Sequence, residues 1–275
     1  MPNRLTRRRL LNSSLLGAGV GVFVFWTAWL DASLARDAFA TGYVLYGLVV
    51  FLAAYNLRKK LPGLPLGTSR LWMQAHAYLG AGSILVLAAH IGWRWPDGWL
   101  EGVLAASFAA TWLSGVVGLY LTRTVPQQLA RTSEQFVFER IPRLRSRVAS
   151  DAQATVLAAV RATGATTLAD LYANRLHGFF NRPRSLAYAL SPTSAARKRL
   201  FNELTASRRL LTDAERTAAE RLFTLIRLKD DLDFHAARQG LLKKWVFLHI
   251  ALTWLLLTLG ATHGLLALAF RGGPT

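Results

Sequence analysis

The sequence contains no cysteine. This absence excludes a structural disulfide, a cysteine-ligated iron–sulfur cluster, a thiol nucleophile and the C-x-x-C-H attachment of c-type haem. Any haem would therefore have to be held by histidine and by packing alone. The chain contains six histidines that could act as ligands.

Acidic residues are scarce, since 15 Asp and Glu face 33 Lys and Arg and give a formal net charge of +18. A basic excess of this size has two interpretations, which are nucleic-acid binding and the positive-inside bias of a membrane protein in contact with anionic lipid. No base-reading motif and no interleaving of aromatic with basic residues accompanies the charge. We therefore predict a membrane and anionic lipid as partners, and no nucleic acid.

What the sequence does have is long apolar blocks that carry almost no charge. Five of them approach or exceed the roughly 20 residues that span a bilayer as a helix. A lone strand cannot satisfy its backbone hydrogen bonds in lipid, so these blocks predict helices. The expected fold class is all-α integral membrane with five transmembrane helices, at Ser13–Leu30, Ala38–Tyr55, Trp72–Trp93, Leu100–Thr122 and Trp245–Phe270.

The distribution of basic residues predicts the topology. Residues 1–12 form a basic cytoplasmic N-terminus, which we interpret as the start of a retained signal anchor, and residues 13–122 carry the first four helices. Residues 123–244 form a helical cytoplasmic insert, with roughly two basic residues for each acidic one. Residues 245–275 are the fifth helix and a short periplasmic tail. These features predict a multi-pass protein of the bacterial inner membrane.

Within the insert, Thr212-Asp213-Ala214-Glu215 has the pattern of a capping box. A helix that begins there could run straight into the fifth span. The other polar features of the insert are two histidines, His177 and His235, and an acidic cluster at Asp230, Asp231 and Asp233. We interpret these histidines as ordinary surface or hinge residues and the acidic cluster as solvated helix surface.

Two of the spans carry histidine pairs with the same spacing. His76 and His90 lie in the third span and His249 and His263 in the fifth, each pair being 14 positions apart. On an α-helix 14 residues rise about 21 Å in just under four turns, so both rings of a pair leave nearly the same face. An even number of crossings separates the two spans, which makes them parallel. His76 and His249 would then face each other on the inner side, and His90 and His263 on the outer side.

Each facing pair offers two imidazoles to one metal, which is what a six-coordinate b-type haem needs. Gly80, Gly260 and Gly264 lie near these histidines and could make room for a flat macrocycle. Ser114-Gly115-Val116-Val117-Gly118 could admit either a neighbouring helix or a porphyrin. The basic residues at the helix ends could bind haem propionates or simply reach the headgroup layer. These are Arg70, Lys243 and Lys244 at the inner ends, and Arg94 and Arg271 at the outer ends.

Histidine pairs 14 apart on two parallel helices resemble the haem core of the cytochrome b superfamily, which includes quinol-oxidising cytochromes b and ferric reductase-type transmembrane domains. The resemblance implies that His76, His90, His249 and His263 are axial ligands of two non-covalent haem b groups. It covers under a third of the chain. The insert between the fourth and fifth spans is an addition to the usual core, and the sequence has no Pro-Glu-Trp-Tyr type quinol motif.

The predicted function is transmembrane electron transfer, as a subunit of an oxidoreductase complex. Electrons would pass between a quinone or a cytoplasmic donor and a periplasmic redox partner, with a multihaem or iron–sulfur protein as the expected partner subunit and a quinone as a further candidate cofactor. Two alternatives stay open. One is a transporter in which the histidines relay protons or bind a metal ion, and the other is a scaffold subunit of a membrane complex.

Overall fold

The computed structural model describes residues 4–32, 37–60, 67–132, 135–182 and 184–270, and all regular structure in these ranges is helical. The predicted tail from Arg271 lies outside them. The chain divides into two compact units. Unit 1 comprises Met1–Tyr120 together with Trp245–Thr275, and unit 2 comprises Leu121–Lys244.

Unit 1 contains the apolar helices. They are α1 (Arg4–Ala32), α2 (Asp37–Lys60), α3 (Ser69–His90), most of α4 (Trp99–Leu129) and the C-terminal part of α10 (Asp213–Ala269). Four of the described helices, α2, α3, α4 and α10, are long and apolar enough to cross a membrane. Helix α1 has a shorter apolar segment in its described part, Ser13–Thr27. The all-helical class predicted from the sequence is therefore confirmed for the described residues, and these helices are compatible with membrane spans by length and composition.

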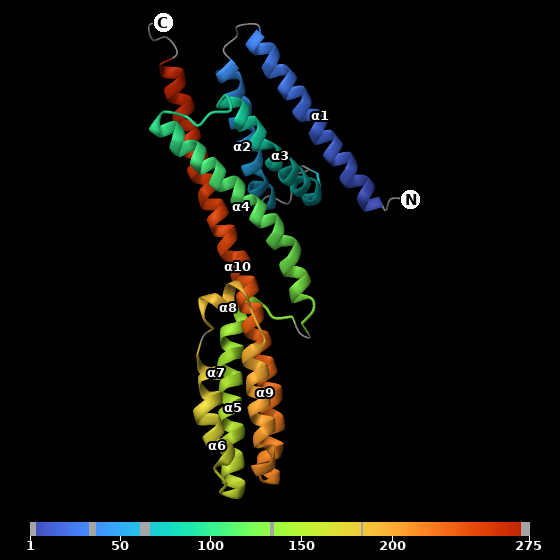
Figure 1. Ribbon diagram of the computed structural model, residues 1–275, viewed down its shortest axis with the longest axis vertical. Helices are drawn as coiled ribbons and strands as arrows, with labels where there is room; N and C mark the ends of the chain where they lie inside the picture. The colour runs from blue at the N-terminus through green and yellow to red at the C-terminus, as the bar shows by residue number, and fades with distance from the viewer. Residues whose placement is uncertain (1–3, 33–36, 61–66, 133–134, 183, 271–275) are drawn as a thin grey trace. The chain divides into compact units, whose positions relative to one another are not determined.

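The closest helix packing in unit 1 is between α2 and α3, with α1 against α3 (Figure 1). Helix α3 and the apolar part of α10 run in the same general direction. A small core of aliphatic and aromatic side chains lies between the helices, formed by Leu45, Val49, Val86, Phe108 and Leu256.

Helix α3 has well-defined ends. The side chain of Thr68 accepts a hydrogen bond from the backbone N–H of Leu71 and caps the start of the helix. The helix ends at His90 because Gly92 and Trp93 both have positive φ angles, of 60° and 59°. The predicted span reached Trp93, so the helix is shorter at this end than the apolar pattern indicated. His90 is consequently the last helical residue of α3.

Unit 2 is a helical domain with its own apolar core. Its elements are α5 (Ile141–Thr163), α6 (Thr167–Leu171), a π-helical turn (Tyr172–Leu176), α7 (His177–Asn181), α8 (Leu186–Leu190), α9 (Ala195–Ser207) and the first part of α10. Two short 3₁₀ turns, Phe138–Arg140 and Arg208–Leu210, precede α5 and follow α9. Apolar residues at helical spacing meet in the core, among them Val148, Ala152, Val156, Leu168, Leu176, Leu204, Leu222 and Ile226.

The predicted capping box at the start of α10 is confirmed. The backbone N–H of Thr212 donates to Glu215 Oε2 at 3.1 Å, and the N–H of Glu215 donates back to Thr212 Oγ1 at 3.4 Å. The other carboxylate oxygen of the buried Glu215 accepts from the N–H of Leu168 at 2.9 Å. The carboxylate of Glu215 therefore accepts hydrogen bonds from backbone N–H groups at the starts of both α10 and α6.

The acidic cluster of α10 is buried, and its interpretation as solvated surface was wrong for two of its members. Asp230 and Asp233 are 5% and 1% exposed. The carboxylate of Asp233 accepts from Lys229 at 2.7 Å, Arg145 at 2.6 Å and Arg184 at 2.9 Å. Burial lowers the pKa of Lys229 and raises the pKa of Asp230, with the opposite charges of their partners acting against both shifts. These ion pairs hold α5, α10 and the segment before α8 together.

We predict that Glu215→Gln destabilises unit 2 by about 1–3 kcal/mol at neutral pH, because the amide N–H₂ would face the N–H of Thr212. Burial acts to raise the pKa of Glu215, but the hydrogen bonds from Leu168 and Thr212 outweigh it and lower the pKa from 4.5. The stabilisation is therefore present above the unfolded-state pKa and is lost as the pH falls through the lower folded-state pKa.

The measurement is amide hydrogen exchange of unit 2 in the full chain, held in detergent, at pH 7 and at acidic pH. The control is Glu220→Gln, which removes the exposed ion pair with Arg208. This variant should change the free energy of unfolding by less than about 0.5 kcal/mol. Equal effects of the two substitutions would contradict the role of Glu215.

Candidate functional site

The structure brings His76 of α3 and His249 of α10 together in unit 1. Their ring centroids are 6.3 Å apart and the ring planes are inclined at 76°. Both rings are partly buried. Of the two pairings predicted from the common spacing, that of His76 with His249 is therefore present, whereas the described side chains show no ring contact between His90 and His263.

Helix α2 fixes the ring of His76. The ring nitrogen Nδ1 lies 3.0 Å from the backbone carbonyl oxygen of Leu52, and the ring of Tyr55 lies 5.2 Å away. A carbonyl oxygen can only accept, so Nδ1 carries the hydrogen and donates it. The lone pair of His76 is then on Nε2.

Helix α4 fixes the ring of His249 through Ser114. The hydroxyl of Ser114 donates to the carbonyl oxygen of Thr111 at 2.7 Å, and Ser114 Oγ lies 2.6 Å from Nδ1 of His249. When its hydroxyl hydrogen points to Thr111, Ser114 Oγ accepts from Nδ1–H of His249, and the lone pair of the ring is then on Nε2. The indole of Trp245 stacks on the His249 ring at 5.7 Å and donates from Nε1 to the carbonyl oxygen of Ser114 at 2.7 Å.

The same logic holds for His90 at the other end of α3. Thr41 of α2 donates its hydroxyl hydrogen to the carbonyl oxygen of Ala38 at 3.2 Å and lies 3.1 Å from Nδ1 of His90. When that hydrogen points to Ala38, Nδ1–H of His90 donates to Thr41 and the lone pair of the ring is on Nε2. The neighbouring residue of α2 is Gly42, and a Cβ atom there would come within 3.0 Å of Cε1 of His90. Glycine at this position lets the ring lie close against α2.

His263 of α10 faces a carboxylate. Its Nδ1 lies 3.9 Å from Oε1 of Glu101, in the first turn of α4. An oxygen therefore lies near Nδ1 of each of the four histidines. Helix α2 supplies this oxygen for both rings of α3, and helix α4 supplies it for both rings of α10. Metal-ligating histidines usually have such a partner, which fixes the ring and its tautomer.

The separation of the His76 and His249 rings is compatible with one metal between them. Two imidazoles on opposite sides of one metal, at about 2.0 Å per metal–nitrogen bond, have ring centroids roughly 6 Å apart. The bond to Leu52 leaves Nε2 of His76 as the nitrogen with the lone pair. In the part of the chain that the structure describes, no group of three or more His, Asp or Glu side chains comes together as metal ligands. A pair suffices for haem, because the porphyrin supplies the other ligands.

The structure shows where the other predicted site residues lie. Arg70 is exposed in the first turn of α3, and Arg94 is exposed in the turn that follows it. Lys244 is exposed and belongs to unit 2. At Gly80, a Cβ atom would meet none of the described atoms within 4 Å.

The small-residue stretch Ser114–Gly118 admits a helix at its Gly118 end. A Cβ atom at Gly118 would overlap the indole of Trp245, so glycine is required for α10 to approach α4 here. The residues that hold the rings, Leu52, Thr41, Ser114 and Glu101, were not predicted as site residues. The presence of Ser114 in this stretch was the one sequence signal for any of them.

His235 of unit 2 is also buried, at 1% exposure, so its interpretation as a surface or hinge residue was wrong. Thr132 donates to the carbonyl oxygen of Leu129 at 2.6 Å and therefore accepts from Nε2–H of His235 at 2.6 Å. Gln239 Nε2 lies 3.3 Å from Nδ1 and donates to it. His235 thus has the opposite tautomer and both ring nitrogens in hydrogen bonds, which is typical of a core histidine.

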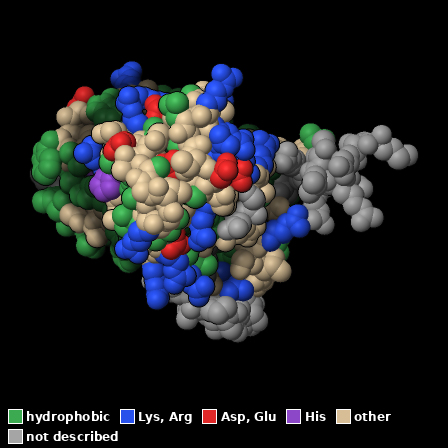
Figure 2. Space-filling model, turned by 90° about the horizontal axis from the view of Figure 1, so that it is seen from below, with side chains coloured by type: hydrophobic (Ala, Val, Ile, Leu, Met, Phe, Trp, Pro, Cys, Tyr) green, Lys and Arg blue, Asp and Glu red, His purple; other side chains and the backbone are tan. Residues whose placement is uncertain are grey.

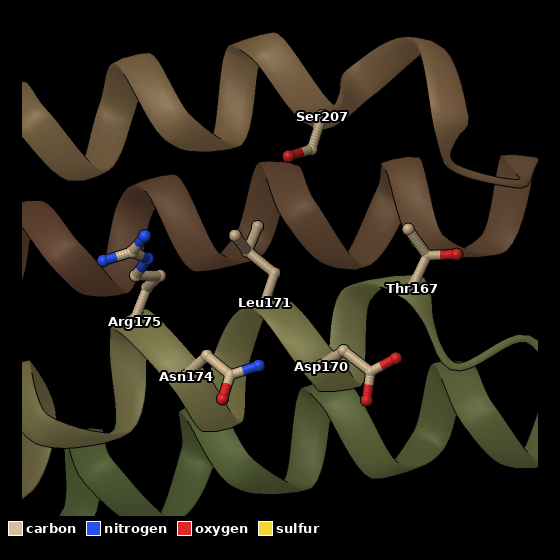
Figure 3. A pocket seen from close by; sticks show the side chains of 6 residues that line it. All are labelled: Thr167, Asp170, Leu171, Asn174, Arg175 and Ser207. Carbon is tan, nitrogen blue, oxygen red and sulfur yellow. The ribbon is translucent and has the colours of Figure 1, made fainter.

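Unit 2 has an open groove of about 610 Å³ between the α6 region and α9 (Figure 3), lined by Thr167, Asp170, Leu171, Asn174, Arg175 and Ser207. Leu171 and Arg175 both extend from the segment that also carries Asp170 and Asn174, toward the side of Ser207 in this view. The groove is polar and shallow, and it offers one carboxylate and one guanidinium.

The sequence matches no family model, and neither a curated protein nor a solved structure is significantly similar to it.

We predict that Gly118→Ala destabilises unit 1 by about 1–3 kcal/mol, since the added methyl group displaces the indole that stacks on His249. The matched control is Gly47→Ala in α2, where a Cβ atom meets no described atom within 4 Å. The control should be neutral or slightly stabilising, because alanine favours a helix over glycine. Thermal unfolding of the full chain in one detergent measures both. An unchanged melting temperature for Gly118→Ala would show that Trp245 does not pack as described.

Proposed function

We propose that this protein is a dihaem b-type cytochrome subunit that transfers electrons across a membrane. The observation that carries the proposal is the His76–His249 pair, with its 6.3 Å ring separation and with an oxygen atom within hydrogen-bond distance of Nδ1 of each ring. A haem iron bound there would supply one-electron reduction and reoxidation. His90 and His263 would hold a second haem about 21 Å along the helix axis.

The surrounding residues have three tasks in this proposal. Leu52, Ser114 and Thr41 orient the ligand rings, which would otherwise rotate. Trp245 covers one face of His249 and limits access of water. Gly80 leaves room beside His76 for a flat group. In lipid, an imidazole N–H without an acceptor is costly, so these contacts also stabilise unit 1 without a cofactor.

The topology, location and partners belong to the same proposal. Five spans would cross a bacterial inner membrane, with the N-terminus and unit 2 in the cytoplasm and the C-terminus in the periplasm. Arg70 and Lys244 at the inner ends, and Arg94 at the outer end, are the candidate cations for haem propionates. A quinone or a cytoplasmic donor would serve one end, and a multihaem or iron–sulfur subunit the other.

The charge of unit 2 supports contact with anionic lipid or with an acidic partner. Arg140, Arg143 and Arg147 are exposed on successive turns at the start of α5. Figure 2 shows Lys and Arg side chains around much of the visible surface, with fewer acidic side chains between them. Nucleic acid is not part of the proposal.

We predict that the purified protein has a low-spin b-type spectrum and two haems per chain. His76→Ala or His249→Ala should remove one haem, and His90→Ala or His263→Ala should remove the other, because each substitution takes away one axial ligand. The measurements are the reduced-minus-oxidised difference spectrum and the haem content per chain.

The control is His177→Ala, an exposed histidine of unit 2, which should retain both haems. A colourless preparation of the folded protein would reject the proposal, and ion flux in vesicles would then favour the histidine-dependent transporter.

A further inference from the structure

Unit 2 has a second open pocket, formed by residues of α7, α8 and the segments next to them. Its volume is about 570 Å³, which is in the range of pockets that hold small ligands. The polar groups that line it are two guanidinium groups and four hydroxyl groups, those of Arg182, Arg184, Ser185, Tyr188, Ser191 and Thr193. None of the described residues that line the pocket is acidic. A lining of cations and hydroxyl donors favours an anion.

The guanidinium of Arg184 has a fixed position in this pocket. Its Nε donates to Asp233 Oδ2 and its Nη2 donates to Asp230 Oδ1, both at 2.9 Å. It also lies 4.8 Å from the ring centroid of Phe179 and 4.8 Å from that of Tyr188. Among the described residues these hydrogen bonds use Nε and Nη2, so the two N–H donors of Nη1 are left for a ligand. A donor that is already held in place loses little freedom on binding.

The carboxylates behind Arg184 do not cancel the positive charge of this region. The ion-pair cluster joins four cations to three carboxylates, those of Arg145, Arg184, Arg197, Lys229, Asp230, Asp231 and Asp233. Four positive and three negative charges leave one formal positive charge, and the exposed Arg182 adds a second. A phosphomonoester carries a charge of about −1.5 to −2 at pH 7, which matches this excess.

The hydroxyl groups of Ser185 and Tyr188 are further donors. Ser185 Oγ accepts from the backbone N–H of Tyr188 at 3.3 Å, so its own hydrogen can be donated to a ligand. Burial and the charge of Asp230 raise the pKa of Tyr188, so its phenol keeps its proton at neutral pH. The terminal oxygens of a phosphate group are strong acceptors for such donors.

We propose that this pocket binds a phosphomonoester group, with Arg182 and Arg184 as its cations and Ser185 and Tyr188 as hydroxyl donors. A pocket of this volume also has room for the organic part of the ester, against the apolar side chain of Phe179. Two sources supply this chemistry, a soluble phosphate ester and the headgroup of a lipid such as phosphatidic acid. The inference is independent of the proposed haem ligands, which lie in unit 1.

The test is amide hydrogen exchange of the full-length protein in detergent, with glycerol 3-phosphate or with sodium chloride at the same ionic strength. The ester should slow exchange in residues 178–182 and 184–193 with a saturating concentration dependence, because a ligand that binds only the folded state stabilises it. The protection should weaken as the pH falls below about 6, where the ester loses its second negative charge. Chloride should give no such protection.

Three substitutions test the donors one at a time. Arg182→Gln removes the exposed cation and should weaken binding about tenfold. Tyr188→Phe removes only a hydroxyl group and should weaken binding about fivefold. Arg184→Lys keeps a cation beside the buried carboxylates but lacks the planar fork, so it should weaken binding as well. The matched control is Arg143→Gln, an exposed arginine of α5 outside this pocket, which should leave binding unchanged.

The same measurement in nanodiscs distinguishes the two sources. Protein in phosphatidylcholine nanodiscs, with and without added glycerol 3-phosphate, is compared with protein in nanodiscs that also contain phosphatidic acid. Protection by glycerol 3-phosphate identifies a soluble ester as a ligand of the pocket. Protection by phosphatidic acid alone identifies the lipid headgroup.

Three results would overturn the proposal. They are no protection of this segment by either ligand, protection of equal size in wild type and all three pocket variants, and protection that chloride reproduces. Each would show that the donors of the pocket do not bind a phosphate ester. A wild-type protein without haem bands would contradict the proposed function and leave this site in place.

Discussion

The hydrogen bond at Nδ1 is the interaction on which the arrangement of unit 1 depends. An imidazole inside a bilayer has to place its N–H against an acceptor, because no water is there to accept it. Helix α2 meets this need for both rings of α3, through Leu52 and Thr41, and α4 meets it for His249 through Ser114. Once Nδ1–H is bound, the ring cannot rotate and the lone pair on Nε2 has a fixed direction. The same contacts therefore stabilise the helix bundle and prepare the rings for a ligand.

The pairing of His76 with His249 could be predicted because it needs only information that lies along single helices. The spacing of 14 gives the common face, and the number of spans gives the relative direction. The acceptors could not be predicted in this way, since each lies on another helix. Ser and Thr in membrane helices commonly bond a carbonyl of the preceding turn, as Ser83 and Ser107 do here. Ser114 makes that bond and also accepts from His249, and only the helix packing distinguishes it.

The errors in unit 2 have a related physical cause. Asp233 and His235 lie in a stretch of α10 whose polar composition is typical of an exposed face. Their burial depends on partners that lie far from them in the sequence, such as Arg145, Arg184 and Thr132. The capping box at Thr212 was predictable because its partners lie three positions apart, although the additional bond from Leu168 was not. Contacts between residues close in the sequence could be predicted from local patterns. The partners of the buried charged and polar side chains are set by the tertiary fold and could not.

The hydrogen bonds at the ring nitrogens separate two kinds of histidine in this chain. His235 donates from Nε2 and accepts at Nδ1, so both nitrogens take part in the hydrogen bonding of a core. His76 donates from Nδ1 to the carbonyl oxygen of Leu52, and a hydroxyl oxygen lies at Nδ1 of His90 and of His249. A packing role would be served by either arrangement. An oxygen atom at Nδ1 is also the arrangement that usually accompanies metal-ligating histidines.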